Sequence, residues 1–169
     1  MDEAPLVVEP LAAHHDRSAF SCGEPALDAY LQRQATQDVR RRVAQVFVAI
    51  GDTPAQIAGY YTLSAASFEK AELPEALAKR LPHYPVPAAI LGRLAIDLAY
   101  QGRHLGEGLL LDAIRRVVRA SAALAVHAII VDAKSARAQT FYERYGFRGF
   151  VTAPGRLFLP LDTVAKLGL

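Results

Sequence analysis

Two stretches of the sequence hold residues that could do chemistry, and the first is the loop QGRHLG, from Gln101 to Gly106. An apolar strand pattern precedes this loop, and apolar residues at helical spacing follow it. The first N–H groups of a helix lack internal partners and carry partial positive charge, so such a loop favours an anion, most naturally a phosphate. Gly102 and Gly106 allow close approach to the backbone, and Arg103 adds charge. An ordinary strand-to-helix turn explains this local pattern equally well, and neither the GxGxxG nor the Walker pattern is present.

The second stretch is AQTFYERYGF, from Ala138 to Phe147, in which Tyr142 is the residue of chemical interest. A phenol near a leaving group can donate a proton to it as a bond breaks. Taken alone, Tyr142 is better explained as a half-buried aromatic side chain on a helix, and Tyr145 is a second candidate one helical turn further on. Phe141 and Phe147 are expected to pack in the core. No general base stands out, and three residues qualify by type only: Asp97, Glu69 and His83.

Neither the histidine pair nor the single cysteine predicts a functional site. His14 and His15 are neighbours whose side chains would point apart on a strand, and no third ligand is evident, so we expect no metal. Cys22 is the only cysteine, which excludes an internal disulfide and a cysteine-based metal site. Because no Cys–His signature accompanies it, we expect a packed thiol near a helix start rather than a nucleophile.

The 169 residues, 52% of them hydrophobic, predict one globular domain spanning residues 1–169. No apolar run approaches the roughly 20 residues of a membrane span, and the acidic N-terminus lacks a signal-peptide pattern, so we expect a cytoplasmic protein. The net charge of +2 alone indicates no polyanionic partner. Arginines nevertheless gather near the end of one predicted helix and along another, where solvated helix faces explain them better than an RNA-binding patch does. They are Arg33, Arg40, Arg41 and Arg42, and Arg115, Arg116 and Arg119.

The elements that must position these residues predict a mixed α/β fold. The strand before the loop is expected at 88–97, and the helix after it has apolar residues at Leu110, Ile114, Val117 and Val118. A strand, this helix and a second strand at 126–132 predict a parallel, right-handed crossover. Further strands are expected at 6–11, 43–50, 56–68, 147–151 and 156–161, helices at 25–41 (capped by Ser21 or Gly23) and 135–145, a short helix or loop at 70–81, and a tail at 162–169.

Both chemical stretches resemble motifs of one enzyme superfamily. QGRHLG resembles the Q/R-x-x-G-x-G/A diphosphate loop of the GNAT acetyltransferases, with His104 at the family's first glycine. AQTFYERYGF is similar to the A-x-x-F-Y-x-x-x-G-F helix and turn of the same superfamily. The segment FSCGEPALDAYL at 20–31 resembles F-x-C-G-x-x-x-L-D-x-[WY]-L of the GNAT-type toxins of bacterial toxin–antitoxin pairs, and LGRLAID at 91–97 resembles their L-G-R-L-A-V-D strand.

The resemblance implies a mostly antiparallel central sheet with one parallel crossover, flanked by helices, and acetyl-CoA as the acetyl donor. It implies that Tyr142 is the general acid and that the strand before the loop pairs with the pantetheine arm. If the acceptor is an RNA, the basic residues Arg93, Arg40 and Arg41 are expected to contact it, although a role as an ion-pair partner explains Arg93 equally well. The residues expected to bind acetyl-CoA are Leu94, Ala95, Ile96, Gln101, Gly102, Arg103, His104, Leu105, Gly106 and Tyr142.

For the toxin branch, the resemblance implies that the acceptor is the α-amine of an aminoacyl-tRNA, and that its acetylation blocks translation. A free α-amine has a pKa of about 7.7–8.0, so it needs less help from a general base than lysine does. The same resemblance implies a ribbon-helix-helix antitoxin as partner and a homodimer. Two alternatives stay open: an acetyltransferase acting on a small-molecule or protein amine, and a non-catalytic acetyl-CoA-binding module in which His104 has disabled the loop.

Overall fold

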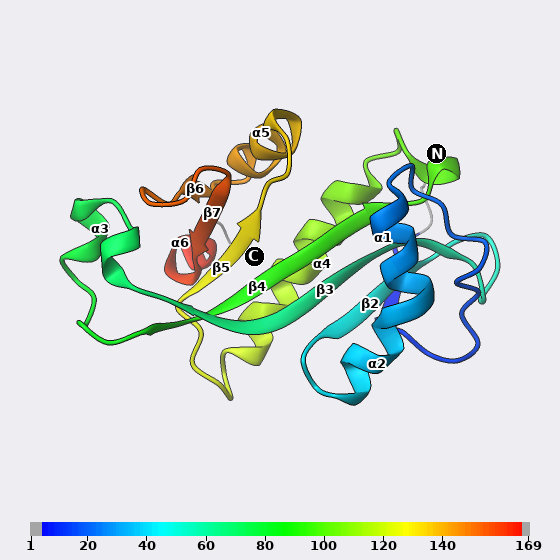
Figure 1. Cartoon of the computed structure of the whole chain (residues 1–169), viewed down its shortest axis with the longest axis horizontal. Coiled ribbons are helices and arrows are strands. Elements are labelled where there is room, and N and C mark those ends of the chain that lie inside the picture. The colour runs from blue at the N-terminus through cyan, green and yellow to red at the C-terminus, as the bar shows by residue number, and fades with distance from the viewer. Residues whose placement is uncertain (1–4, 167–169) are drawn as a thin grey trace. The chain divides into compact units, whose positions relative to one another are not determined.

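The strands of the protein form one seven-stranded sheet with the order β1-β2-β3-β4-β5-β7-β6 (Figure 1). The computed structural model describes residues 5–166. Helices flank the sheet, so the predicted mixed α/β fold is confirmed. The strands are β1 (Val8–Pro10), β2 (Gln45–Ile50), β3 (Ile57–Phe68), β4 (Val86–Ile96), β5 (Ala128–Asp132), β6 (Arg148–Gly149) and β7 (Arg156–Pro160).

The pairing of the strands is mainly antiparallel, as expected. β1 with β2, β2 with β3, β5 with β7 and β6 with β7 are antiparallel pairs. β4 and β5 are parallel, with a register that runs from Ala88 opposite Ala128 to Leu91 opposite Val131. Helix α4 (Leu105–Ala120) connects these two strands, which confirms that the predicted crossover is parallel.

The predicted N-terminal helix forms as three consecutive segments. They are α1 (Pro25–Ala29), the π-helical turn η1 (Tyr30–Gln34) and α2 (Ala35–Arg40). Glu24 is the N-cap and Pro25 occupies the first turn, so the prediction of Ser21 or Gly23 as cap is wrong. Proline fits there because it has no N–H to leave unpaired.

The other helical segments match the predicted positions except for η3, which lies where a loop was expected, and at the C-terminal end. There the predicted tail is wrong, because it contains α6, whose Val164 is fully buried. Six residues give too short a pattern to reveal a helix that one buried contact stabilises. The last three residues of that predicted tail lie outside the described residues. The segments are η2 (Lys70–Glu72), α3 (Glu75–Ala78), η3 (Leu98–Tyr100), α5 (Ala136–Arg144) and α6 (Leu161–Lys166).

The described residues form two compact units, and each has its own buried cluster. The first unit holds residues 5–64 and 92–114, and the second holds 65–91 and 115–166. The single domain at 1–169 therefore stays a prediction. None of the helices within residues 5–166 has the length and apolar character needed to cross a membrane.

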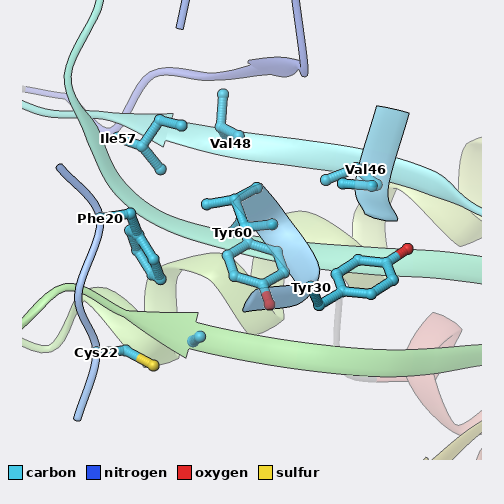
Figure 2. Close-up of a cluster of buried hydrophobic side chains, with 10 residues drawn as sticks. Phe20, Cys22, Tyr30, Val46, Val48, Ile57 and Tyr60 are labelled. Carbon is cyan, nitrogen blue, oxygen red and sulfur yellow. The ribbon is translucent and has the colours of Figure 1, made fainter. Parts of the chain in front are cut away.

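Three aromatic rings centre the core of the first unit (Figure 2). Phe20 meets Tyr60 edge-on with ring centroids 5.4 Å apart, and Tyr30 stacks nearly parallel to Tyr60 at 6.3 Å. The Tyr60 hydroxyl donates a hydrogen bond to the Leu27 carbonyl at 2.7 Å. Strand side chains alternate, so the neighbouring Tyr61 faces the other side of β3 and donates to the Asp112 carboxylate of α4 at 2.5 Å. The sheet of this unit therefore has α1 and α2 on one face and the start of α4 on the other.

The second unit packs around three phenylalanines. Phe68 meets Phe150 edge-on at 5.7 Å, and Phe150 meets Phe158 at 5.2 Å. All three are at most 7% exposed. Strand β5 runs through this core, and four of its five residues, Ala128–Val131, are buried. This near-continuous apolar burial is typical of a strand covered on both faces.

Candidate functional site

The loop between η3 and α4 has a backbone shape suited to an anion. Gly102 has φ +81° and His104 has φ +60°, so both residues lie in the left-handed region. Chains that alternate right- and left-handed residues direct successive N–H groups into one concavity. His104 directly precedes α4 and keeps the backbone shape a glycine would adopt, at a cost of roughly 1–2 kcal/mol for its β-carbon. His104 therefore occupies the left-handed conformation that a glycine adopts without this cost.

Gly106 leaves open space over the first turn of α4. A β-carbon added there would meet only the Ile96 side chain, at 3.8 Å, which is ordinary van der Waals contact. Its φ does not lie in the left-handed region either. Neither packing nor backbone conformation therefore requires this glycine, and the room it leaves fits a ligand that lies against the helix N-terminus.

Gln101 anchors the loop to the protein. Its side-chain nitrogen donates to the Ile96 carbonyl at 2.9 Å and to the Cys22 carbonyl at 3.0 Å. Asp97 also connects these segments, because its carboxylate accepts hydrogen bonds from the backbone N–H groups of Ser21, before α1, and of Ala99, in η3. These contacts hold the end of β4, the start of the loop and the segment before α1 together.

Two exposed side chains add charge and hydrogen-bonding capacity to the loop. The Arg103 guanidinium lies 5.3 Å from the centre of the Tyr100 ring. His104 Nδ1 lies 3.8 Å from the Glu107 carboxylate, and 89% of the His104 side chain is exposed. Leu105 is half-buried at the first position of α4.

Strand β4 continues beyond its pairing with β5. In the part of the chain that the structure describes, the β4–β5 register ends at Leu91, while β4 runs on to Ile96. On the side facing away from β3, Leu94, Ala95 and Ile96 therefore have no β5 residue in register. A strand edge of this kind can pair with an extended ligand.

Arg93 is fixed against the helical face of the first unit. Its guanidinium carbon lies 3.5 Å from the centre of the Tyr30 ring, which is a cation–π contact. The Tyr30 hydroxyl donates to the Asp38 carboxylate at 2.9 Å. Burial, followed by this hydrogen bond, raises the pKa of Tyr30 to about 12. Sequence reasoning included Tyr30 only as part of the motif at 20–31 and missed its contacts with Arg93 and Asp38, because only the fold brings η1, α2 and β4 together.

The other two arginines expected to contact RNA are exposed. Arg40 ends α2 and Arg41 follows it, with exposed Arg33 on the preceding π-helical turn. Arg42 has a left-handed φ of +60°, where the chain turns towards β2. The structure therefore leaves these guanidinium groups at the surface of the first unit.

Tyr142 belongs to the second unit, on α5, and only 8% of it is exposed. Its ring meets Phe141 and Phe147 edge-on, with centroids 5.2 and 5.5 Å away. Burial raises the pKa of Tyr142 to about 12, so the phenol keeps its proton at neutral pH. Phe147 is buried as predicted, whereas Phe141 and Tyr145 are half-buried. Ser135 caps the helix, and Gly146, with φ +96°, ends it.

The two adjacent histidines converge on one carboxylate, so the expectation that their side chains point apart is wrong. The Glu9 Oε1 atom lies 2.6 Å from His15 Nε2 and 3.4 Å from His14 Nε2. The possible ligand atoms of these three residues lie within 4.8 Å of one another. However, His15 Nδ1 accepts a hydrogen bond from the Ala12 N–H, which in the neutral ring leaves the proton on Nε2. That Nε2–H donates to Glu9, so the tautomer favours a structural hydrogen bond over a metal ligand.

Cys22 is a packed thiol, as predicted. It is 9% exposed, its Sγ donates to the Glu24 carbonyl, and burial together with Asp28 raises its pKa to about 11. A thiol with a raised pKa is a poor nucleophile at neutral pH.

The residues considered as general bases have other contacts. Asp97 accepts the two backbone hydrogen bonds described above. Glu69 caps η2 in a reciprocal arrangement with Glu72, and His83 Nε2 lies 3.5 Å from Lys70 Nζ. These contacts explain all three residues without a catalytic role.

Comparison with known proteins identifies the family. The chain matches the family described as "Acetyltransferase (GNAT) domain" over residues 42–149. It is 38% identical over 154 residues to the "tRNA-acetylating toxin" of Mycobacterium tuberculosis (strain H37Rv), with 90% of this chain and 91% of that protein covered.

Solved structures of similar proteins indicate the same family. AtaT complexed with acetyl-methionyl-tRNAfMet has a TM-score of 0.91 and 34% identity, covering 98% of this chain and 100% of that one. A tyrosine-to-phenylalanine mutant of AtaT bound to the C-terminus of the antitoxin AtaR and acetyl-CoA has a TM-score of 0.83 and 32% identity, covering 96% and 98%. The predicted resemblance is confirmed, and the chain belongs to the GNAT family of N-acetyltransferases, which use acetyl-CoA.

Proposed function

We propose that this protein is a toxin that transfers an acetyl group from acetyl-CoA to the α-amine of an aminoacyl-tRNA and thereby blocks translation. The observation that carries the proposal is the 38% identity to the tRNA-acetylating toxin across 90% of this chain. The likeness to AtaT, which was solved with acetyl-methionyl-tRNAfMet, supports the same acceptor class.

The residues of the first unit fit acetyl-CoA. The diphosphate binds at the loop from Gly102 to Gly106, where the first N–H groups of α4, the α4 dipole and Arg103 favour negative charge. Gln101 acts as the anchor of this loop. The pantetheine arm pairs with the free edge of β4 at Leu94, Ala95 and Ile96.

Acetyl-CoA supplies an activated thioester carbon, and the amine of the acceptor forms the new C–N bond as the C–S bond breaks. Tyr142 is the general acid that protonates the departing thiolate; the nitrogen loses one proton to solvent as the amide forms, and the phenol regains its proton from solvent. Its raised pKa of about 12 keeps the phenol protonated, which is the state an acid needs. An α-amine with a pKa of about 7.7–8.0 keeps a sizeable neutral fraction at cell pH, so it attacks without a dedicated base.

Arginines of the first unit hold the acceptor. Arg93, fixed on Tyr30 at 3.5 Å, presents a pre-positioned guanidinium for a phosphate or for the ester end of the tRNA. Exposed Arg40 and Arg41 contact phosphates further along the RNA. Because the reaction leaves the amine acetylated, the product cannot accept a peptide at that nitrogen.

The proposal includes the biological setting of a toxin–antitoxin pair. The AtaT complex with the C-terminus of AtaR supports an antitoxin partner, for which we propose the ribbon-helix-helix class. We further propose a homodimer that acts in the cytoplasm, where aminoacyl-tRNA is found.

The test is mass spectrometry of charged total tRNA after incubation with the purified protein and isotope-labelled acetyl-CoA. Label is expected on an aminoacyl amine, and the fragment mass identifies the amino acid. Tyr142→Phe should lose the label, and deacylated tRNA serves as the acceptor-free control. An unlabelled tRNA pool together with labelled polyamines or peptide amines would refute the toxin and leave an acetyltransferase of small-molecule or protein amines.

A further inference from the structure

We propose that Asp38 is a positioning residue for the acceptor: through the Tyr30 phenol, it holds the Arg93 guanidinium in place for the aminoacyl-tRNA. This inference rests on the proposed function, which places Arg93 against the acceptor, and it gives a role to a carboxylate that no step of the reaction uses. All three residues belong to the first unit, where they lie on η1, α2 and β4.

The Arg93 guanidinium is held by its face and keeps its N–H groups available. Its central carbon lies 3.5 Å from the centre of the Tyr30 ring, which is van der Waals contact. In the part of the chain that the structure describes, Arg93 has no ion pair, and none of its nitrogen atoms is buried without a partner. A guanidinium bound in this way keeps the planar fork of donors that suits a phosphate or an ester carbonyl.

Tyr30 is a rigid support for this contact. It is 5% exposed and stacks on Tyr60 at 6.3 Å with 15° between the rings (Figure 2). Its hydroxyl donates to the Asp38 carboxylate at 2.9 Å. Burial and this hydrogen bond raise the pKa of Tyr30 to about 12, so at neutral pH the phenol remains the donor and the carboxylate the acceptor. Asp38 therefore anchors the polar end of the ring that carries Arg93.

The π-helical turn brings Asp38 onto the same side of the helix as Tyr30. Residues eight positions apart lie about 80° apart around a regular α-helix. In η1 the Ala35 N–H bonds to the Tyr30 carbonyl, five residues earlier, so the turn takes up one extra residue. Tyr30 and Asp38 are then related as residues seven positions apart, which share one face. Single π-helical turns are frequent at functional sites, and here the turn forms the support of Arg93.

The hydrogen bond strengthens the hold on Arg93 through the charge of the carboxylate. A bond from a phenol to a carboxylate is charge-assisted, and it polarises the donor, so the ring presents more electron density to the cation. Without Asp38 the guanidinium is held less firmly, and the acceptor must order it on binding. Ordering one mobile arginine typically weakens affinity about 2- to 12-fold.

The test measures kcat and KM for charged total tRNA at saturating acetyl-CoA. Asp38→Leu removes the acceptor of the hydrogen bond and should raise KM about 2- to 12-fold with unchanged kcat. Asp38→Asn keeps an oxygen that accepts from the phenol and should restore most of the wild-type KM. Tyr30→Phe breaks the same hydrogen bond from the other side, so it should also raise KM and keeps the proposal testable if Asp38→Leu does not fold.

A double-mutant cycle separates positioning from a general loss of structure. If Asp38 acts through Arg93, adding Asp38→Leu to Arg93→Gln should not raise KM further, because the arginine is already gone. Effects that multiply in the double variant overturn the proposal. Tyr60→Phe is the matched control, since it removes a hydroxyl of the same aromatic core that donates to Leu27 instead. It should lower the urea midpoint of unfolding and keep the wild-type KM for tRNA.

The role of Asp38 and the proposed function fail in different ways. Wild-type KM for tRNA in both Asp38→Leu and Tyr30→Phe, with tRNA acetylation intact, overturns the role of Asp38 and leaves the proposed function standing. An equal rise in KM for acetyl-CoA in these variants also overturns it, because a positioning role acts on the acceptor only. A wild-type protein that labels no aminoacyl-tRNA overturns both.

Discussion

Replacing Gly106 with alanine is expected to weaken acetyl-CoA binding without weakening the fold. The added β-carbon meets the Ile96 side chain at an ordinary 3.8 Å, and φ at this position suits any residue. Alanine is a better helix former than glycine, so the free energy of unfolding should stay equal or rise by up to about 1 kcal/mol. The same methyl group occupies room beside the α4 N–H groups. Loss of one hydrogen bond to a charged phosphate costs about 1.5–3 kcal/mol, or about 10- to 150-fold in Kd.

Gly59→Ala in the same unit is the matched substitution with the opposite expectation. Its β-carbon would lie 2.8 Å from Ile96 Cδ1, 2.9 Å from Leu109 Cδ1 and 2.9 Å from the Ala95 carbonyl oxygen. The two side-chain ends can rotate, but the carbonyl can move only with β4. Overpacking of this kind typically costs about 1–3 kcal/mol of stability.

Urea denaturation and calorimetric titration with acetyl-CoA measure both quantities on each variant. Wild-type affinity in Gly106→Ala would refute the placement of the diphosphate over the first turn of α4. A drop in its stability would refute the open space at Gly106. Wild-type stability in Gly59→Ala would refute the close packing of β3 against β4 and α4.

Three further predictions concern chemistry, RNA binding and pH. Tyr142→Phe is expected to lower kcat by about 10²–10⁴-fold with unchanged acetyl-CoA affinity, and a kcat loss below tenfold in steady-state assays would rule Tyr142 out as the acid. Replacing Arg40 and Arg41 with glutamine should reduce the salt dependence of tRNA binding by about one unit of slope per lost phosphate contact; an unchanged slope in filter binding at several salt concentrations would place the RNA elsewhere. Burial raises the pKa of Cys22 to about 11 and of Tyr142 to about 12, so the stability that these neutral groups contribute is fully present below about pH 9 and is lost as the pH rises towards 12. Urea denaturation at several alkaline pH values checks this, and an unfolding free energy that stays constant up to pH 12 would contradict it.

Patterns that depend on neighbouring residues predicted most of the fold. The hairpin of β2 and β3, the crossover through α4 and the helix that carries Tyr142 all follow from local periodicity and turn residues. The motifs at 101–106 and 138–147 indicated the family for the same reason, because a diphosphate loop and a helix turn are each built from consecutive residues. α6 was missed because tertiary packing of Val164, rather than a long amphipathic pattern, accounts for it.

Contacts between distant segments could be decided only by the tertiary structure. The cation–π contact of Arg93 with Tyr30 joins β4 to η1. The β4–β5 register ends at Leu91 while β4 continues to Ile96, and no local pattern shows where the pairing of two strands so far apart in the sequence stops. The sequence by itself determined which residues have side chains suited to catalysis or to ligand binding, and which helices, strands and loops contain them. Their partners, burial and pKa depend on long-range packing, which sequence spacing does not encode.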